Sequence, residues 1–222
     1  MASFDNAWEE IFQNQEWGRY PSEEVIRFIA RNFYKKNRAQ IKLLDIGCGT
    51  GAVTWYMARE GFAVYAFDGS ETAAHKARQR MQEEGLYAHI CVSDAASLPY
   101  SDDFFDGLVD SAAISGNTAE NIKKILQECF RVLKTGGKLF STGLFKVGMS
   151  GYGTGEKLEE NTYREITEGN LAHRGTIHFF EEQEIRALWS QAGFQNIAID
   201  SADRTEQGGQ NRISYFMVEA QK

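Results

Sequence analysis

The stretch that decides the fold is Leu43-Leu44-Asp45-Ile46-Gly47-Cys48-Gly49-Thr50-Gly51. Its apolar start, residues 43–46, is typical of a buried strand, and residues 51–59 behind it have the pattern of a helix. The glycines at 47, 49 and 51 lack a Cβ and adopt positive φ easily, so a flat ligand can lie against the main chain. Amide groups at the start of the helix would face that ligand. The stretch therefore predicts a cofactor-binding loop of the nucleotide type.

Strand-like and helix-like segments alternate from residue 40 onward, which is typical of a parallel sheet with helices on both faces. The predicted strands are 43–46, 64–67, 88–92, 105–109, 138–142, 194–199 and 213–218. The polar stretch 201–212 separates the last two, which we expect to form a closing hairpin. Further helices are predicted at 51–59, from Ser70 to about Gly85, along the apolar face 122–133 and at 181–192. The fold class is α/β.

Two helices are predicted ahead of the first strand. Phe4, Trp8 and Phe12 recur at four-residue spacing, so they would form one aromatic face, packed on the body of the protein or over a pocket. Ser22 is placed as the N-cap of the next helix. Without a linker-like or low-complexity stretch, we expect one domain over residues 1–222.

Composition limits the classes of function. Of 222 residues, 42% are hydrophobic, which is enough for a packed core, and the net charge of −7 disfavours capture of a nucleic-acid backbone. Three cysteines without a C-x-x-C pair indicate reduced thiols and no metal site. The N-terminal twenty residues do not resemble a signal peptide, and no stretch has the roughly 18 apolar residues of a membrane span. We expect a cytoplasmic protein, monomeric or homodimeric, without a membrane or nucleic-acid partner.

Polar residues follow the predicted strands at the edge of the sheet where ligands bind in open α/β folds. Asp68 follows the second strand at close to the roughly 20-residue separation expected for a carboxylate that binds ribose hydroxyls. Asp94 follows the third strand and is placed to accept an adenine amino group. Asp110 and Ser111 follow the fourth.

Four ordered motifs carry a family resemblance: Leu44-Asp45-Ile46-Gly47-Cys48-Gly49-Thr50-Gly51; Phe67-Asp68-Gly69-Ser70; Ser93-Asp94-Ala95 with Leu98-Pro99 and Phe105-Asp106; and residues 128–137. With these, the chain resembles the class I S-adenosylmethionine-dependent methyltransferases, particularly the "type 11" branch that acts largely on small molecules. The resemblance implies a three-layer Rossmann-like fold with a seven-stranded, mostly parallel sheet and an antiparallel last strand. It also implies S-adenosyl-L-methionine as cofactor, S-adenosyl-L-homocysteine as product, and a small-molecule acceptor.

The same resemblance assigns the cofactor site. Gly47 and Gly49 would back the methionine part, Asp68 would hold the ribose, Asp94 and Ala95 would flank the adenine, and Asp110 would lie near the transferred methyl. Arg19 and Tyr20 would pair with the cofactor's carboxylate and pack on it. The full set expected at the cofactor is Asp45, Gly47, Cys48, Gly49, Gly51, Asp68, Gly69, Ser70, Asp94, Ala95, Asp110, Ser111, Arg19 and Tyr20.

By the same comparison, residues 1–36 form a helical cap, 40–142 the cofactor-binding core, 145–180 a substrate-covering insertion and 181–222 a closing helix and strand pair. Residues 111–117 lack an acid or base, so the candidates for a general base are His173 and His178, both within the insertion. Either histidine is equally compatible with a role as a loop residue or a helix contact.

Three functions remain open on the sequence alone. The first is methyl transfer to an O or N atom of a small polar metabolite by in-line displacement. The second is a non-catalytic S-adenosylmethionine-binding or regulatory subunit, favoured by the missing base after Asp110. The third is an NAD-dependent oxidoreductase, permitted by the spacing of Gly47, Gly49 and Ala52 but disfavoured by Asp45 and the later motifs.

Overall fold

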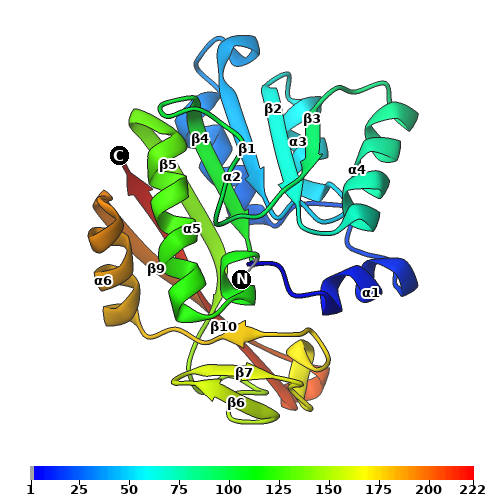
Figure 1. Cartoon of the computed structure of the whole chain (residues 1–222), viewed down its shortest axis with the longest axis vertical. Helices are drawn as coiled ribbons and strands as arrows, with labels where there is room; N and C mark the ends of the chain where they lie inside the picture. Colours follow the sequence, from blue (N-terminus) through cyan, green and yellow to red (C-terminus); the bar gives the residue numbers. More distant parts are fainter. Residues whose placement is uncertain (1–2) are drawn as a thin grey trace.

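The computed structural model describes residues 3–222, and a seven-stranded sheet with the order β3-β2-β1-β4-β5-β10-β9 forms its centre (Figure 1). The strands are β1 (Lys42–Ile46), β2 (Ala63–Asp68), β3 (His89–Val92), β4 (Phe105–Ser111), β5 (Leu133–Phe145), β9 (Gln195–Glu206) and β10 (Asn211–Gln221). Strands β1 to β5 run parallel, and β10 is antiparallel to both β5 and β9. The predicted sheet, with its antiparallel last strand, is confirmed. Met1 and Ala2 of the expected cap lie outside the described residues.

Helices cover both faces of the sheet because β1 is apolar on both sides. Leu43 packs in a cluster with α2 (Glu23–Phe33) and α3 (Ala52–Arg59), whereas its neighbour Leu44 packs in a cluster with α5 (Ala119–Val132) and α6 (Glu182–Ala192). This alternation follows from the two-residue period of a strand. In Figure 1, α5 lies in front of the sheet and α2 behind it. The result is the expected three-layer arrangement.

Local signals set several helix ends. The Ser70 hydroxyl accepts a hydrogen bond from the Ala73 amide at 3.0 Å and so caps α4 (Glu71–Glu83). Gly193 ends α6 in the left-handed conformation at φ 107°. Ser22 precedes α2 as predicted, but its hydroxyl makes no cap hydrogen bond. The predicted helix start is therefore correct, but the side-chain capping bond expected from Ser22 is not formed.

The segment 145–180 forms a second sheet of three short antiparallel strands, β6 (Glu156–Glu159), β7 (Thr162–Arg164) and β8 (Ile177–His178). We call it the small sheet. It has its own apolar cluster, which includes Met149, Tyr163 and Phe179. Figure 1 places it beyond the carboxyl ends of β1 and β4. The sequence of this segment predicts no strands.

The closing hairpin is longer than predicted. Strands β9 and β10 pair from Gln195 with Gln221 to Glu206 with Asn211, so most of the polar stretch 201–212 is strand. Many of these polar side chains are exposed because β9 is an edge strand of the sheet. Within the part of the chain that the structure describes, no helix is long and apolar enough to cross a membrane.

Candidate functional site

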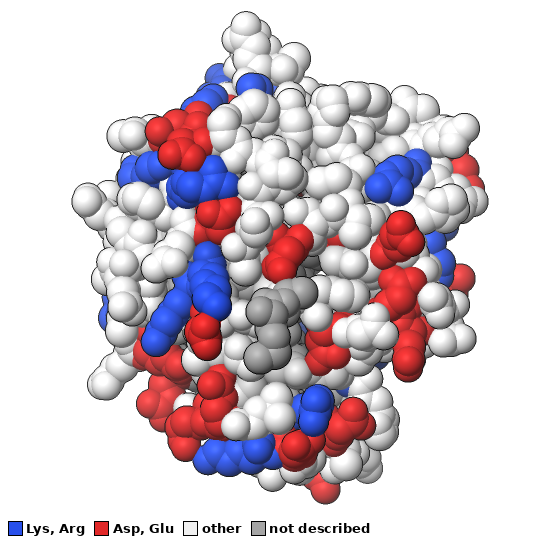
Figure 2. All heavy atoms as spheres, viewed as in Figure 1, with Lys and Arg blue, Asp and Glu red and all other residues white. Residues whose placement is uncertain are grey.

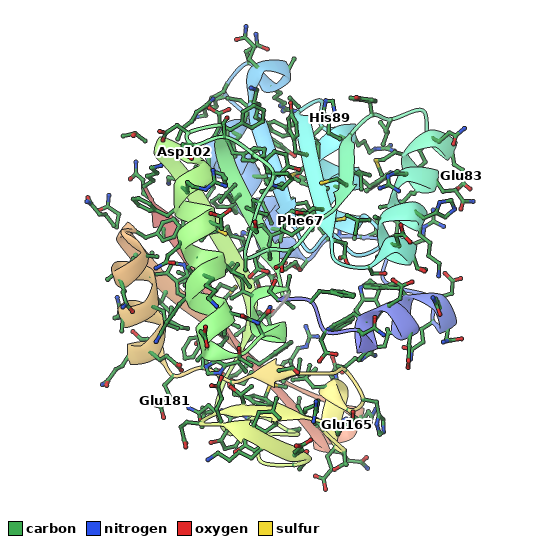
Figure 3. All side chains as sticks on the ribbon, in the orientation of Figure 1. Phe67, Glu83, His89, Asp102, Glu165 and Glu181 are labelled. Carbon is green, nitrogen blue, oxygen red and sulfur yellow. The ribbon has the colours of Figure 1, made fainter. Side chains whose placement is uncertain are left out.

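A cavity of about 180 Å³ opens at the carboxyl ends of β1, β2 and β4. Its walls come from the loop after β1, from the ends of β2, β3 and β4, and from the N-terminal segment with α1 (Ala7–Asn14). In Figure 3, the labelled Phe67 lies near the centre of the molecule at this end of β2, and His89 marks the opposite end of the sheet on β3. The cavity therefore lies where the sequence analysis expected a ligand.

The glycine loop leaves bare main chain at the cavity wall. Gly47 and Gly49 have φ values of 60° and 52°, a region that favours glycine. A Cβ on Gly47 would lie 2.4 Å from the Cβ of Ala113, so any side chain at position 47 would collide with the chain after β4. The amide of Cys48 donates to the Phe67 carbonyl at 2.9 Å and fixes the loop to β2.

Asp68 joins this loop to the next one. Its Oδ2 accepts a hydrogen bond from the Gly49 amide at 2.8 Å, and its Oδ1 accepts one from the Ser70 amide at 2.9 Å. Burial raises the pKa of the carboxyl group, and the two amide donors oppose that rise. Each carboxylate oxygen has two acceptor positions, so one on each remains for a ligand. Asp68 is thus placed to hold a hydroxyl group at the cavity wall.

Two other rim carboxylates support the walls from behind. Asp45 Oδ2 accepts hydrogen bonds from the amide and the hydroxyl of Thr54 at 2.8 and 2.6 Å and so fixes α3. Asp110 Oδ1 accepts from the amides of Ala113 and Ile114 at 2.9 and 3.1 Å. Burial raises the pKa of both carboxyl groups to about 7. Asp45 also borders the cavity. Asp110 does not border it, but Asp110 holds Ala113 and Ile114, and both of these residues line the cavity.

The carboxylate of Asp94 is already paired within the chain. Its two oxygens accept hydrogen bonds from the amide of Ser3, at 3.0 Å, and from the Ser3 hydroxyl. The Phe4 ring lies on Gly69, where an added Cβ would be 2.2 Å from a ring carbon. Ser93 and Ala95 border the cavity, as do Ser3 and Phe4. The place expected for adenine is therefore lined by the N-terminal segment of the same chain.

Comparison with known proteins agrees with this geometry. A family profile described as a methyltransferase domain matches residues 43–137. A solved S-adenosylmethionine-dependent methyltransferase from Methanosarcina mazei has a TM-score of 0.72 at 25% identity, covering 88% of this chain and 96% of that one. These similarities identify residues 43–137 as a methyltransferase domain and support a class I S-adenosylmethionine-dependent methyltransferase. S-adenosylmethionine is therefore its cofactor, as the sequence predicted.

Other similar proteins act on different acceptors. The UbiE C-methyltransferase of ubiquinone and menaquinone biosynthesis from Pectobacterium carotovorum is 27% identical over 72% of this chain and 68% of its own length. The tRNA N(3)-methylcytidine methyltransferase Mettl2 of Drosophila melanogaster is 25% identical over 69% of this chain. The chain spans about half the length, 48%, of the latter and 62% of an uncharacterized protein from Haemophilus influenzae.

Several predicted residues of this methyltransferase lie away from the cavity. The Arg19 side chain is 64% exposed, 3.8 Å from Glu84, and Tyr20 is 71% exposed and packs edge-on against Trp55. Gly51 and Ser70 begin α3 and α4 behind the wall. Arg19 and Tyr20 therefore do not cover the site in this structure.

Aromatic residues of the N-terminal segment, rather than Arg19 and Tyr20, lie over the glycine loop. Trp8, Phe12 and Trp17 pack against one another with ring centroids 5.6 to 5.8 Å apart, and Phe12 and Trp17 lie over Gly49. We call these three rings the aromatic cover. The spacing of Trp8 and Phe12 predicts an aromatic face on the body of the protein or over a pocket, and the structure places both residues at the cavity. Trp17 lies beyond α1, outside that four-residue spacing.

Neither candidate histidine borders the cavity. His173 is exposed in a separate hollow between α1 and the loop ahead of β8. His178 is buried, with Nδ1 2.7 Å from the Thr162 hydroxyl and Nε2 3.0 Å from a Glu184 oxygen. Among residues 3–222, no Lys, Arg or His borders the cavity, and no group of His, Cys, Asp or Glu is arranged to hold a metal ion.

Proposed function

We propose that this protein transfers the methyl group of S-adenosylmethionine to an N or O atom of a small metabolite that carries no anionic group. The observation behind this proposal is the meeting of bare main chain at Gly47 to Gly49 with the carboxylate of Asp68 at one cavity wall. In the proposed complex, the loop 47–49 lies against the methionine part of the cofactor, and the free acceptor positions of Asp68 receive the ribose hydroxyls. Asp94 and Ala95 flank the adenine, and Ser111 lies toward the reacting methyl.

Methyl transfer requires little from the protein beyond positioning the acceptor and the cofactor. The sulfonium group of the bound cofactor supplies an activated methyl. The chain's own residues would hold the acceptor in line with that methyl, an effect that reaches roughly 7–11 kcal/mol in favourable cases. The aromatic cover would exclude water from the glycine loop.

Charge at the cavity limits the acceptor. Phosphate and carboxylate groups are commonly bound by Arg or Lys, and no basic side chain of the described residues borders this cavity. The N-terminus of α3, at Ala52, also borders the cavity, but it follows the loop 47–49 and would face the cofactor. Asp5 does border it; although burial opposes ionisation, hydrogen bonds from Ala7 and Thr176 lower the pKa of its carboxyl group. A neutral or cationic acceptor is therefore favoured.

No histidine among the described residues borders the cavity, and its carboxylates Asp5, Asp45 and Asp68 already accept hydrogen bonds from the chain. This arrangement favours nucleophiles that need no strong base. An amine needs only to arrive unprotonated, whereas an ordinary hydroxyl benefits from a general base. With His173 and His178 away from the cavity, we expect an amine or ring nitrogen, or a hydroxyl acidic enough to ionise by itself.

A nucleic-acid acceptor is disfavoured by charge. The chain has 31 acidic and 24 basic residues, and Figure 2 shows acidic side chains interspersed with basic ones on the face of Figure 1, without a continuous basic patch. A protein that binds a phosphate backbone usually presents such a patch. We therefore propose a small-molecule acceptor despite the similarity to a tRNA methyltransferase.

The test is an assay of S-adenosylhomocysteine release with four acceptor pools: amines and nitrogen heterocycles, phenols, phosphorylated or carboxylated metabolites, and tRNA. Asp68→Ala serves as the variant with an impaired cofactor site. We expect activity with the first two pools and its loss in the variant. Release with tRNA or with phosphorylated acceptors alone would contradict the proposal, and cofactor binding without release in any pool would favour the non-catalytic alternative.

A further inference from the structure

We propose that Ser3 and Phe4 are an intramolecular competitor of the cofactor: they occupy the adenosine half of the site and must leave when S-adenosylmethionine binds. We call this segment the N-terminal latch. The inference rests on the proposed function, because it assumes that the nucleoside binds at Asp68 and Asp94. It adds a closed state of the site.

The latch uses the atoms that the nucleoside would need. Ser3 donates two hydrogen bonds to the carboxylate of Asp94, one from its amide and one from its hydroxyl. An adenine amino group would donate to the same carboxylate. Phe4 covers Gly69 so closely that an added Cβ would lie 2.2 Å from its ring. A planar base and the Phe4 ring cannot occupy that position together.

The space that remains is too small for the whole cofactor. The cavity measures about 180 Å³ with the latch in place, whereas sites for ligands of this size generally measure about 300–1,000 Å³. Ser3 and Phe4 both border this cavity, so their departure would enlarge it. The volume of the cavity and the hydrogen bonds of Ser3 thus indicate independently that the cofactor and the latch cannot be bound together.

The chain that follows the latch is held by other contacts. Within it, α1 is tied to α4, since Glu9 accepts hydrogen bonds from Ser70 and Thr72 and the Lys76 ammonium donates to the Phe12 carbonyl. Asp5 accepts hydrogen bonds from the amide and hydroxyl of Thr176, next to β8, both at 2.8 Å. Opening at Ser3 and Phe4 therefore need not unfold α1, but it would loosen the link between the cofactor site and the small sheet.

A closed state that excludes the cofactor lowers its apparent affinity by the fraction of open molecules. We would therefore titrate S-adenosylhomocysteine, by calorimetry, into the wild type, the double variant Ser3→Ala, Phe4→Ala and the control Asn6→Ala. Asn6 is exposed next to the latch and its side chain caps no helix. We expect about tenfold tighter binding by the double variant, which corresponds to about 1.4 kcal/mol, and no change in the control.

A second measurement needs no variant. Hydrogen exchange of the wild type with and without S-adenosylhomocysteine should show faster exchange in residues 3–8 when the nucleoside is bound. A segment that instead closes over bound cofactor would exchange more slowly, and its removal would weaken binding. Slower exchange, or equal or weaker binding by the double variant, would overturn the latch alone. Failure of all three proteins to bind the nucleoside would overturn the proposed function, and the latch with it.

Discussion

Replacing Asp68 by Asn changes one atom of a residue that holds two loops together. The carboxylate accepts from the amides of Gly49 and Ser70, whereas the side-chain amide of Asn has a single oxygen. One of the two backbone amides would then face an NH₂ group and lose its acceptor. A buried unsatisfied donor costs about 1–3 kcal/mol.

A second effect offsets part of that cost. Asp68 is 6% exposed, and burial raises the pKa of its carboxyl group, so the variant no longer carries a buried charge. We therefore expect a net loss of about 1–2 kcal/mol in the free energy of unfolding, which is the lower part of the range for an unsatisfied donor. For a chain of this length, that loss lowers Tm by about 2–8 °C.

Cofactor binding should fall further than stability. If Asp68 also receives the ribose hydroxyls, the variant loses a hydrogen bond to a charged acceptor, about 1.5–3 kcal/mol, or roughly 10- to 150-fold in Kd. Urea denaturation gives the first quantity and calorimetric titration with S-adenosylhomocysteine gives the second. Asp200→Asn, at an exposed position on β9, is the matched control. Unchanged stability would refute the loop-linking role, and unchanged affinity would refute the ribose role.

Other substitutions test separate parts of the account. Gly47→Ala should abolish cofactor binding and lower Tm, because the new methyl group would collide with the Ala113 side chain and because the positive φ at position 47 disfavours L residues. Wild-type affinity in this variant would contradict the binding of the cofactor against the main chain of the loop 47–49. His178→Ala should cost about 2–4 kcal/mol in the free energy of unfolding, because it leaves a buried cavity and removes the hydrogen-bond partner of Thr162 and Glu184. His173→Asn should leave both the stability and the pH profile of activity unchanged. Loss of turnover in the His173 variant, with normal cofactor binding, would instead identify His173 as a base. For Asp110, the pKa of about 7 in the folded protein exceeds the value of about 3.9 in the unfolded chain, so its contribution to stability is complete below pH 4 and is lost as the pH rises through 7. Asp110→Asn keeps an acceptor for both backbone amides but cannot ionise, so the unfolding free energy should depend less on pH between 4 and 8, with a residual slope from Asp45. Urea denaturation at several pH values measures this slope. An unchanged slope would argue against a buried titrating group at this position.

The parts of the fold that depend on local pattern could be predicted. The glycine loop and the residues that follow β2 are encoded within a few positions of sequence, and their chemistry requires particular residue types. The α/β alternation is equally local, because a strand needs a two-residue period and a helix needs a 3.6-residue period. Gly193 and Ser70 acted as helix-end signals for the same reason.

The parts that depend on distant contacts could not be predicted. Asp94 was assigned to adenine, but nothing near it in the sequence indicates that Ser3, 91 positions away, donates to it. His178 is a plausible base by residue type, and only its contacts with Thr162 and Glu184 show it to be buried support. Strands as short as β8 arise through pairing with distant neighbours rather than through a pattern of their own.

In the proposed complex, the nucleoside of S-adenosylmethionine binds against the loop 47–49 with its ribose on Asp68. A crystal structure of the protein grown with S-adenosylhomocysteine tests it most directly. We expect density for the nucleoside along the glycine loop, ribose oxygens within hydrogen-bond distance of Asp68, and Ser3 displaced from Asp94. An unliganded cavity at saturating nucleoside, or a nucleoside bound elsewhere on the protein, would contradict it.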